Sequence, residues 1–508
     1  MNIWIFYEMN HMCKNIYKYL KQNKERNPHQ FAFIDEDESL TFEQLYNYSL
    51  SYSDAISTKC NVGDIILIIT SRSCHIPALF YGIAMAGCTY VPVDETLPID
   101  RILKIVHLVT PSLIINCSKR KISGLSYDIT LNELLDDCFV GDFIPNDDLS
   151  LPLYVMFTSG STGVPKGVTV SQMNVLQYVE TMVDLFKIDG TDVLTTLASF
   201  DFDATIRDIY GALVCGCSVV LLPSQIINQP TKVVEAIYKF KVTVLFSWSA
   251  AAIQIIAQTS AINNLRGSVL RKIFFSGSVL RPQYLKQWQS VLPNVMFCNL
   301  YGPTECTGTT TYYIVDRIVN DWDDDFPLGR AIPGRKVLII DPNDPTRILQ
   351  KGELGEICIG GIGVSLGYYN DEKESQLKFI QNPCCHEYFD RIYRTGDIGR
   401  INPQTSLLEF HGRVDRQVKI WGHRVELDEI EKMANLVNGV EDCAALYEPN
   451  KNCVTLLYCG GDHVIENLAI FLREKLPRYM VPRRFIRVDK LQYTYRQKKD
   501  YKFLEHYL

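Results

Sequence analysis

The sequence predicts an α/β protein with a large N-terminal unit and a small C-terminal one. The chain has 508 residues, which is longer than the segment that a single hydrophobic core usually organises. Short apolar runs alternate with longer helical patterns over most of its length. Beyond Gly329 this alternation gives way to short strands and turns, and a separate helix-and-strand pattern follows Asp415.

The first 330 residues read as layers of helices on a largely parallel sheet. The runs of β-branched and apolar residues predict buried strands at 64–70, 153–157, 218–222, 242–246 and 272–275. Helices are predicted between them, with the clearest patterns at 172–186 and 231–241.

The remainder predicts a smaller β-rich subdomain and then an α+β module. Short strands are expected at 336–340, 355–359, 391–395 and 407–411. A helix at 426–436, strands at 443–447 and 454–459, and a helix at 466–475 follow. We therefore expect an N-terminal core over residues 1–414 and a C-terminal domain over 415–508.

Composition excludes several classes of protein. The net charge of −7 gives no reason to expect nucleic acid, and no apolar run approaches the roughly 18 residues that span a membrane. The sixteen cysteines are scattered without a C-x-x-C pair, so the sequence predicts free thiols in a reducing cytoplasm rather than a zinc cluster. Charge is uneven, however: residues 473–508 carry eleven Lys or Arg against four acids. That segment is either a solvated basic tail or a surface for phosphates or an acidic protein.

The sharpest local signal is the run TSGSTGVPKG at 158–167, which lies between two apolar strands. Its three glycines free the backbone to turn N–H groups inward, and its four hydroxyls add donors for phosphate oxygens. Lys166 adds a positive charge. A flexible linker is the plain alternative, but linkers are rarely held between buried strands. No GK[ST] follows, so this is not a Walker loop.

At this loop the chain resembles the adenylate-forming (AMP-binding) superfamily, in particular free-standing adenylation domains of nonribosomal peptide synthetases. Further motifs follow in the family's order. They are AGCTYVPVD (86–94), FDAT (202–205), NLYGPTE (299–305), GELGE (352–356), YRTGD (393–397), GRVDRQVK (412–419) and LPRYMVP (476–482).

The resemblance implies ATP and Mg²⁺ as cofactors and a small C-terminal domain that moves as a lid. Thr304 and Glu305 would lie at the α-phosphate and the metal, and Glu305 offers the hard oxygen ligand that Mg²⁺ prefers. Tyr301 would stack on adenine, and Asp397 would accept from two ribose hydroxyls. The full ATP-binding set implied is Thr158, Ser159, Gly160, Ser161, Thr162, Gly163, Lys166, Tyr301, Asp397 and Arg413.

Two positions in the C-terminal module matter for such a cycle. Lys498 matches the lysine that bridges the substrate carboxylate and the nucleotide, with Lys499 as a competing candidate. Gln497 and Tyr495 replace a glycine and a proline usual in that loop. Asp415 matches the hinge about which the small domain swings, although taken alone it is an ordinary turn residue.

The substrate pocket implied by the resemblance favours an amino acid, because Asp203 matches the aspartate that pairs with a substrate ammonium group. Its walls would be Ala204, Arg207, Ala250, Phe274, Ser276, Leu300, Gly308 and Thr309. Arg207 suggests an acidic substrate side chain. The alternative is a salt bridge between Arg207 and Asp203, which would share a face if both lay on one helix.

The function expected is ATP-dependent formation of an aminoacyl-adenylate, followed by transfer to the phosphopantetheine thiol of a separate carrier protein. Two alternatives stay open. One is an acyl-CoA synthetase of the same fold, against which Asp203 argues. The other is an impaired nucleotide-binding partner, suggested by Gln497 and Tyr495. Neither nucleic acid nor a membrane is expected as a partner.

Overall fold

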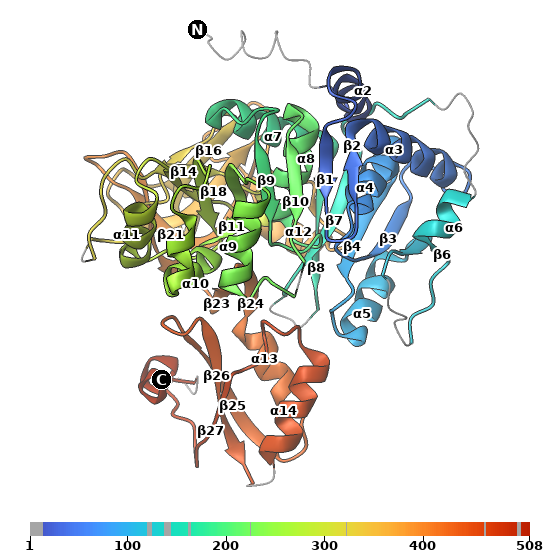
Figure 1. The fold of residues 1–508 in the computed structure, drawn as a ribbon. Coiled ribbons are helices and arrows are strands. Elements are labelled where there is room, and N and C mark those ends of the chain that lie inside the picture. Colours follow the sequence, from blue (N-terminus) through green and yellow to red (C-terminus); the bar gives the residue numbers. More distant parts are fainter. Residues whose placement is uncertain are drawn as a thin grey trace.

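The computed structural model describes residues 14–118, 124–136, 144–160, 164–223, 225–321, 323–461, 464–494 and 499–508. These residues form two large mixed sheets with helices packed on them, a smaller β-rich sheet beside them, and a C-terminal module below (Figure 1). The α/β fold class predicted from the sequence is confirmed.

The first large sheet has the strand order β19-β8-β7-β4-β3-β5-β6. Its strands from β7 to β6 run parallel, and β8 and β19 are antiparallel additions at one edge. The bounds are β3 (Ile65–Thr70), β4 (Thr89–Asp94), β5 (Leu113–Asn116), β6 (Ile129–Thr130), β7 (Pro152–Thr158), β8 (Lys166–Ser171) and β19 (Gly367–Tyr368).

The second sheet has the order β15-β14-β13-β12-β11-β9-β10-β1-β2 and is parallel from β13 to β1. Its bounds are β1 (Phe31–Ile34), β2 (Ser39–Thr41), β9 (Val193–Thr196), β10 (Ser218–Leu221), β11 (Val244–Ser249), β12 (Lys272–Ser276), β13 (Met296–Tyr301), β14 (Thr311–Ile314) and β15 (Arg330–Ala331).

Helices bury their apolar faces against these sheets. The largest core joins side chains of α2, α3, α4, α7 and α8 to both sheets, for example through the edge-on rings of Tyr81 and Tyr210. The bounds are α2 (Ile16–Arg26), α3 (Phe42–Ser57), α4 (His75–Met85), α5 (Ile99–Val109), α6 (Leu131–Asp136), α7 (Gln172–Phe186), α8 (Ile206–Cys215), α9 (Pro230–Lys239), α10 (Ala250–Ala257) and α11 (Pro282–Val291).

Local sequence explains where several elements begin and end. Thr41 and Gln44 form a capping box that starts α3, and Ser171 and Asn174 do the same for α7. The predicted strand at 242–246 begins later, as β11 at Val244. The Val242 N–H caps α9 by donating to the Ile237 carbonyl, so Val242 belongs to the helix end.

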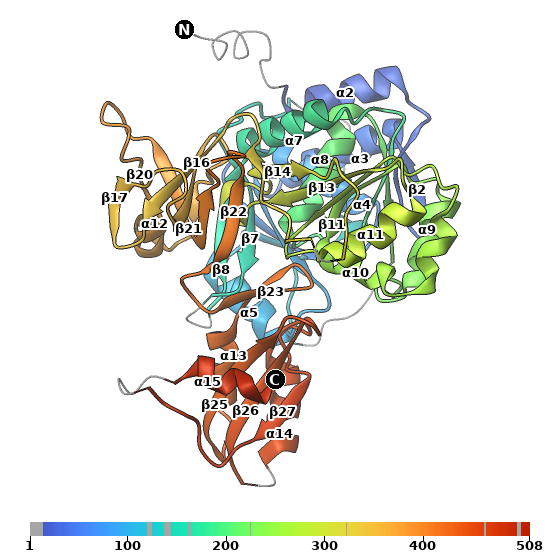
Figure 2. The ribbon, with the colours of Figure 1, turned by 90° about the vertical axis from the view of Figure 1, so that its left-hand side faces the viewer.

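The β-rich subdomain is a six-stranded sheet with the order β17-β16-β18-β21-β20, and β22 pairs with β21. It lies on one flank of the large sheets (Figure 2). Its bounds are β16 (Arg335–Asp341), β17 (Asp344–Ile348), β18 (Gly355–Gly361), α12 (Glu372–Lys378), β20 (Phe379–Gln381), β21 (Arg391–Ile401) and β22 (Leu408–Arg413).

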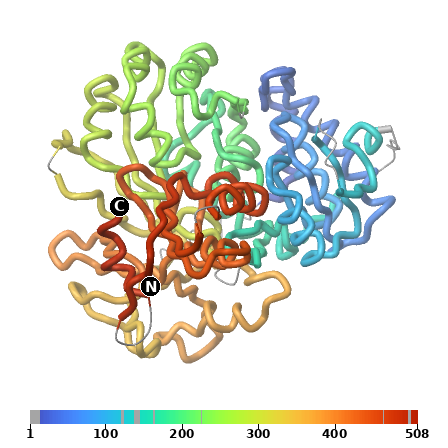
Figure 3. The backbone as a smooth tube through the Cα atoms, turned by 90° about the horizontal axis from the view of Figure 1, so that it is seen from below, coloured from blue at the N-terminus to red at the C-terminus, as the bar shows by residue number. Residues whose placement is uncertain are grey.

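The C-terminal module has its own apolar core, made by a hairpin, a three-stranded sheet and two helices. Seen from below, it lies across the junction of the other parts (Figure 3). Its bounds are β23 (Gln417–Ile420), β24 (His423–Glu426), α13 (Leu427–Ala434), β25 (Val440–Glu448), β26 (Cys453–Gly460), α14 (Val464–Lys475), β27 (Arg484–Arg487) and α15 (Tyr501–Leu504). The domain boundary at Asp415 stays a prediction.

Among the described residues, no helix combines the length and apolar character needed to cross a membrane.

Candidate active site

A cavity of about 120 Å³ lies where the core, the β-rich subdomain and the C-terminal module meet. The strands β7, β12 and β13 point their carboxyl ends at it, through Thr158, Ser276 and Tyr301. In open α/β sheets, ligands bind at that end of the strands. The cavity is smaller than the roughly 300 Å³ at the low end for small-molecule sites, and residues of the hairpin β23–β24 contribute to its lining.

The predicted phosphate loop joins β7 to β8 and reaches this cavity through Thr158 and Ser159. A Cβ atom at Gly160 would lie 2.1 Å from the Val164 carbonyl oxygen, so the loop requires glycine there. Ser159 Oγ donates to the Arg424 carbonyl oxygen at 2.7 Å. Ser161, Thr162 and Gly163 lie outside the described residues.

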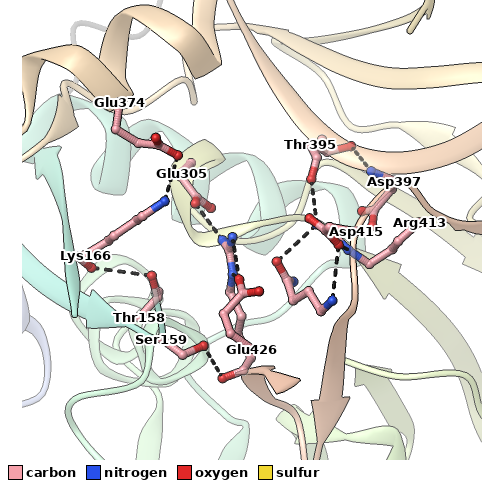
Figure 4. A network of polar contacts seen from close by, with 12 residues as sticks. Thr158, Ser159, Lys166, Glu305, Glu374, Thr395, Asp397, Arg413, Asp415 and Glu426 are labelled. Atoms are coloured by element: carbon pink, nitrogen blue, oxygen red, sulfur yellow. Dashed lines mark hydrogen bonds and ion pairs between the residues drawn. The ribbon is translucent and has the colours of Figure 1, made fainter. Parts of the chain in front are cut away.

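Lys166 lies at the start of β8 but does not line the cavity. Its ammonium group binds the Glu374 carboxylate at 2.7 Å, as Figure 4 shows. A phosphate at the loop would therefore have to compete with Glu374 for this charge.

The predicted ribose contact, Asp397, lines the cavity and is already paired. The Tyr301 hydroxyl donates to Asp397 at 2.5 Å. The Arg413 guanidinium binds the same carboxylate (Figure 4). Burial raises the pKa of Tyr301 well above its ordinary value, and the Asp397 charge adds to that effect. Arg413 also donates to Asp415 at 2.6 Å, which ties the predicted hinge to the nucleotide side of the cavity.

Glu305 is completely buried and offers one free carboxylate oxygen. Its Oε1 atom accepts from the Tyr368 hydroxyl at 2.7 Å and from Arg424 Nη1 at 2.8 Å. Its Oε2 atom has no hydrogen-bond partner among the described residues. Burial works to raise the pKa of Glu305, but the Arg424 charge and the Tyr368 hydroxyl outweigh it and hold the pKa below its usual value. An ionised, unpartnered oxygen facing the cavity fits a hard divalent cation.

The predicted substrate residues Asp203 and Arg207 both line the cavity, and they do not pair with each other. Asp203 lies in a 3₁₀ turn before α8, so the two side chains do not share one α-helical face as expected. Arg207 donates instead to Thr309 Oγ1 at 3.4 Å and Ser276 Oγ at 3.3 Å, and its Nε atom has no partner. The alternative of an Asp203–Arg207 salt bridge is therefore wrong.

Arg207 is only 3% exposed, and the ordinary partner for a buried guanidinium is a carboxylate. Burial raises the pKa of Asp203, against the opposing effects of the Thr304 hydroxyl, Lys419 and Arg207. The cavity lining thus holds a buried cation, Arg207, and a partly buried acid, Asp203.

Other predicted wall residues divide into two groups. The residues that line the cavity are Ala204, Leu300, Gly308, Thr309 and Ser276, together with Thr304. Ala250 and Phe274 are buried but do not line it: Ala250 is the first residue of α10, and the Phe274 ring packs edge-on against Phe186 and Phe246. Lys498 lies outside the described residues, and its neighbour Lys499 binds Glu431 and Asp442 within the C-terminal module.

The residues that sequence reasoning missed come mostly from the hairpin β23–β24. Lys419, His423 and Arg424 all line the cavity. A Cβ atom at Gly277 would lie 3.1 Å from the Gly422 Cα atom, so the hairpin turn packs directly on the end of β12. Burial lowers the pKa of Lys419, although the nearby carboxylates of Asp397 and Asp203 oppose that shift. The positively charged residues of this hairpin were the sequence feature that could have indicated its place in the cavity.

Comparison with known proteins identifies the family. The family model for AMP-binding enzymes matches residues 20–369, more than half of the chain. The chain belongs to the AMP-binding enzyme family. The resemblance to adenylate-forming enzymes read from its motifs is thus confirmed.

Several curated proteins are similar to this chain over nearly its whole length. The D-alanine--D-alanyl carrier protein ligase of Bacillus licheniformis is 29% identical over 96% of this chain and 98% of its own length. Zwittermicin A synthase ZmaJ of Bacillus cereus is 28% identical over 97% and 95%. Bacitracin synthase 1 of Bacillus licheniformis is 30% identical over 97% of this chain, which spans only 9% of that protein's length.

Solved structures of similar fold include holo-PA1221, described as an NRPS protein with adenylation and PCP domains. It has a TM-score of 0.85 at 24% identity and covers 97% of this chain and 84% of its own. The Vibrio cholerae adenylation domain AlmE, solved with glycyl-adenosine-5'-phosphate, has a TM-score of 0.83 at 23% identity, with 98% of both chains covered. At this identity the likeness shows the fold.

Proposed function

We propose that this chain uses ATP to convert an amino acid into an aminoacyl-adenylate and then passes the acyl group to the phosphopantetheine thiol of a separate carrier protein. The observation that carries the proposal is the meeting of Glu305, Asp397 and Asp203 in one cavity. These carboxylates suit three different parts of the reactants: a metal-bound phosphate, a ribose and an ammonium group.

The first half-reaction joins a substrate carboxylate oxygen to the α-phosphorus of ATP and releases pyrophosphate. Negative charge accumulates on the phosphates during this step, so fixed donors and cations lower the barrier. Thr158 and Ser159 supply donors at the loop, and Lys166 supplies a charge once it leaves Glu374. Glu305 would hold Mg²⁺ through its free Oε2 atom, and the bound ion would neutralise phosphate oxygens.

The second half-reaction forms a thioester as the carrier thiol attacks the acyl carbonyl and AMP leaves. The arrangement of the C-terminal module suits this step better than the first. Arg424 forms an ion pair with Glu305. Lys499, the neighbour of Lys498, binds Glu431 within the module and does not line the cavity. We propose that the module turns about Asp415 to bring Lys498 in for adenylation, and returns to this arrangement for thioester formation.

We further propose an acidic amino acid as the substrate. Asp203 would pair with the ammonium group, and Arg207 would receive the side-chain carboxylate between Ser276 and Thr309. A buried guanidinium with an unpaired Nε atom is costly in the free enzyme, and an acidic ligand removes that cost.

The carrier as acceptor is supported by the carrier protein ligase and the adenylation–PCP proteins among the relatives. The basic segment 473–508 offers a surface for an acidic partner.

Amino-acid-dependent exchange of labelled pyrophosphate into ATP tests the proposal. A panel of the common amino acids should give the fastest exchange with aspartate, glutamate or a longer homologue, and Lys498→Ala should abolish it. Preference for an aliphatic amino acid would contradict the proposal of an acidic substrate but not the proposal of adenylation. ATP binding without exchange for any acid would contradict the enzyme reading, and thioester formation with free coenzyme A and a simple acid would establish the acyl-CoA synthetase instead.

A further inference from the structure

A second cluster of metal-ligand side chains lies away from the nucleotide cavity, between the β1–β2 turn and the start of α4. It consists of Glu38, Cys74 and His75, whose carboxylate oxygen, Sγ and imidazole nitrogen all lie within 4.8 Å of one another. None of the three lines the cavity of the active site. Cys74 is fully buried, His75 is partly buried, and Glu38 is exposed.

The ligand atoms of the cluster lie close to the separations that a single small ion requires. The His75 Nε2 and Glu38 Oε1 atoms are 3.0 Å apart. Ligands about 2.0 to 2.3 Å from a tetrahedral ion are separated by about 3.3 to 3.8 Å. Small rotations of the exposed Glu38 side chain would therefore admit an ion without moving the backbone.

Surrounding residues hold these ligands in place. The Tyr52 hydroxyl lies 3.1 Å from His75 Nδ1, so a proton on Nδ1 leaves the Nε2 lone pair directed at the cluster. Asp35 accepts from the Cys74 N–H at 2.7 Å and from the Glu38 N–H at 2.8 Å, which fixes the turn against the helix. The His75 ring is therefore oriented by a hydrogen bond to its other nitrogen, as is usual at metal sites, and backbone contacts hold Cys74 and Glu38 near it.

We propose that Glu38, Cys74 and His75 bind one divalent transition-metal ion of the Zn²⁺ type. A thiolate, an imidazole and a carboxylate together select borderline-soft ions such as Zn²⁺ over Mg²⁺ or Ca²⁺. Binding replaces the thiol S–H bond by a sulfur–metal bond and releases one proton to solvent. The ion ties the β1–β2 turn to α4 and serves stability rather than adenylation.

Sequence spacing gave no sign of this site. Cys74 and His75 are adjacent, and the third ligand is 36 positions earlier on another element. The spacing of a zinc finger is absent, and only the packing of β2 and α3 against α4 brings the ligands together.

The test uses the full-length protein, purified in chelator and titrated with Co²⁺ as a spectroscopic probe. We expect a 1:1 complex with a thiolate-to-cobalt charge-transfer band, displaced by Zn²⁺ with a dissociation constant below about 1 μM. Cys74→Ser should abolish the band. Glu38→Gln, an exposed change that leaves the fold intact, should weaken binding at least tenfold and reduce the Zn²⁺-induced rise in melting temperature.

The double variant Cys384→Ser/Cys385→Ser is the matched control, because it removes the adjacent pair that includes an exposed thiol and should keep the band. A band that survives Cys74→Ser, or one that is lost in the control, would overturn the proposal. Failure to bind Co²⁺ or Zn²⁺ in a 1:1 ratio would do the same. Neither result bears on pyrophosphate exchange, so this proposal and the proposed function fail independently.

Discussion

At the scale of single residues, we propose that Arg207 decides which amino acid the pocket accepts. Replacing it with Met removes a buried cation while keeping an unbranched side chain. Loss of a charge-assisted contact of about 3 kcal/mol predicts a fall of about 100-fold in kcat/KM for the acidic substrate. Arg207→Lys, which keeps the charge, should lose less. Equal losses for acidic and uncharged substrates in pyrophosphate exchange would show that Arg207 acts only on the fold.

Also at this scale, we propose that Arg424 opposes metal binding at Glu305. Arg424→Gln removes the guanidinium 2.8 Å from Glu305 Oε1. We expect pyrophosphate exchange to need about tenfold less Mg²⁺, because an ion at Oε2 no longer shares the Glu305 charge with a guanidinium whose contact is worth about 1.5 kcal/mol. Arg416→Gln, another lid arginine that does not line the cavity, should leave the Mg²⁺ dependence unchanged. An unaltered requirement in Arg424→Gln would contradict that proposal.

At the scale of elements, the hairpin β23–β24 carries a pH dependence through His423. Its ring stacks on Tyr479 at a centroid distance of 4.0 Å and lies 5.3 Å from Phe202 of the core. Burial lowers the pKa of His423 from 6.5 to about 4. The unfolded state therefore binds a proton on His423 below pH 6.5, whereas the folded state binds it only below about pH 4. The free energy of unfolding therefore falls as the pH falls from 6.5 to 4.

Between pH 7 and pH 5 this one group should lower the free energy of unfolding by about 2 kcal/mol. Denaturation followed at both pH values, for the protein and for His423→Gln, isolates the effect, because all other titrating groups are shared. The variant should lose about 2 kcal/mol less than the parent on acidification. Parallel losses would show that His423 is not buried as a neutral ring.

The secondary-structure elements differ in how well the sequence predicts them. The helical pattern at 172–186 predicts helix α7 with its observed ends, and the structure shows that Ser171 and Asn174 cap its start. The phosphate loop was recognisable because glycine and hydroxyl residues are rare between buried strands. The hairpin β23–β24 carries a weaker signal, its cations. It is short, and its polar residues meet their partners through contacts between distant segments, such as Arg424 with Glu305.

At the scale of the whole molecule, two ion pairs hold the C-terminal module against the core. Arg101 Nη1 and Glu429 Oε1 are 2.9 Å apart and buried, and Lys475 binds Asp100 on the same helix, α5. Glu429→Gln leaves Arg101 buried without its anion, a change that costs about 3 to 5 kcal/mol where such pairs are broken. We expect a smaller population of this arrangement and slower thioester formation, with pyrophosphate exchange unaffected or faster.

Hydrogen exchange at α5 and α13 provides the readout, since loosening the interface should raise exchange in both. The double variant Arg101→Gln/Glu429→Gln is the control and should recover part of the loss, because no uncompensated charge remains. Unchanged exchange and thioester rates in Glu429→Gln would contradict a role for this pair in holding the module.

The sequence anticipated the two-part architecture but not how the parts meet. Alternating strands and helices indicated the large α/β unit, and a change of pattern after Asp415 indicated the smaller module. The orientation of one against the other depends on contacts such as Arg101–Glu429 between residues 328 positions apart. No local pattern encodes such pairs, and a single chain offers no second sequence in which they could be seen to vary together.

The central claim is that a substrate carboxylate attacks the α-phosphorus of ATP in this cavity, and oxygen transfer tests it most directly. The amino acid found by pyrophosphate exchange is labelled with ¹⁸O in its α-carboxylate, incubated with the enzyme and ATP, and the adenylate is cleaved with a thiol. We predict AMP that carries one ¹⁸O atom, with Asp203→Asn forming it far more slowly. Unlabelled AMP, or ADP as the nucleotide product, would contradict the account.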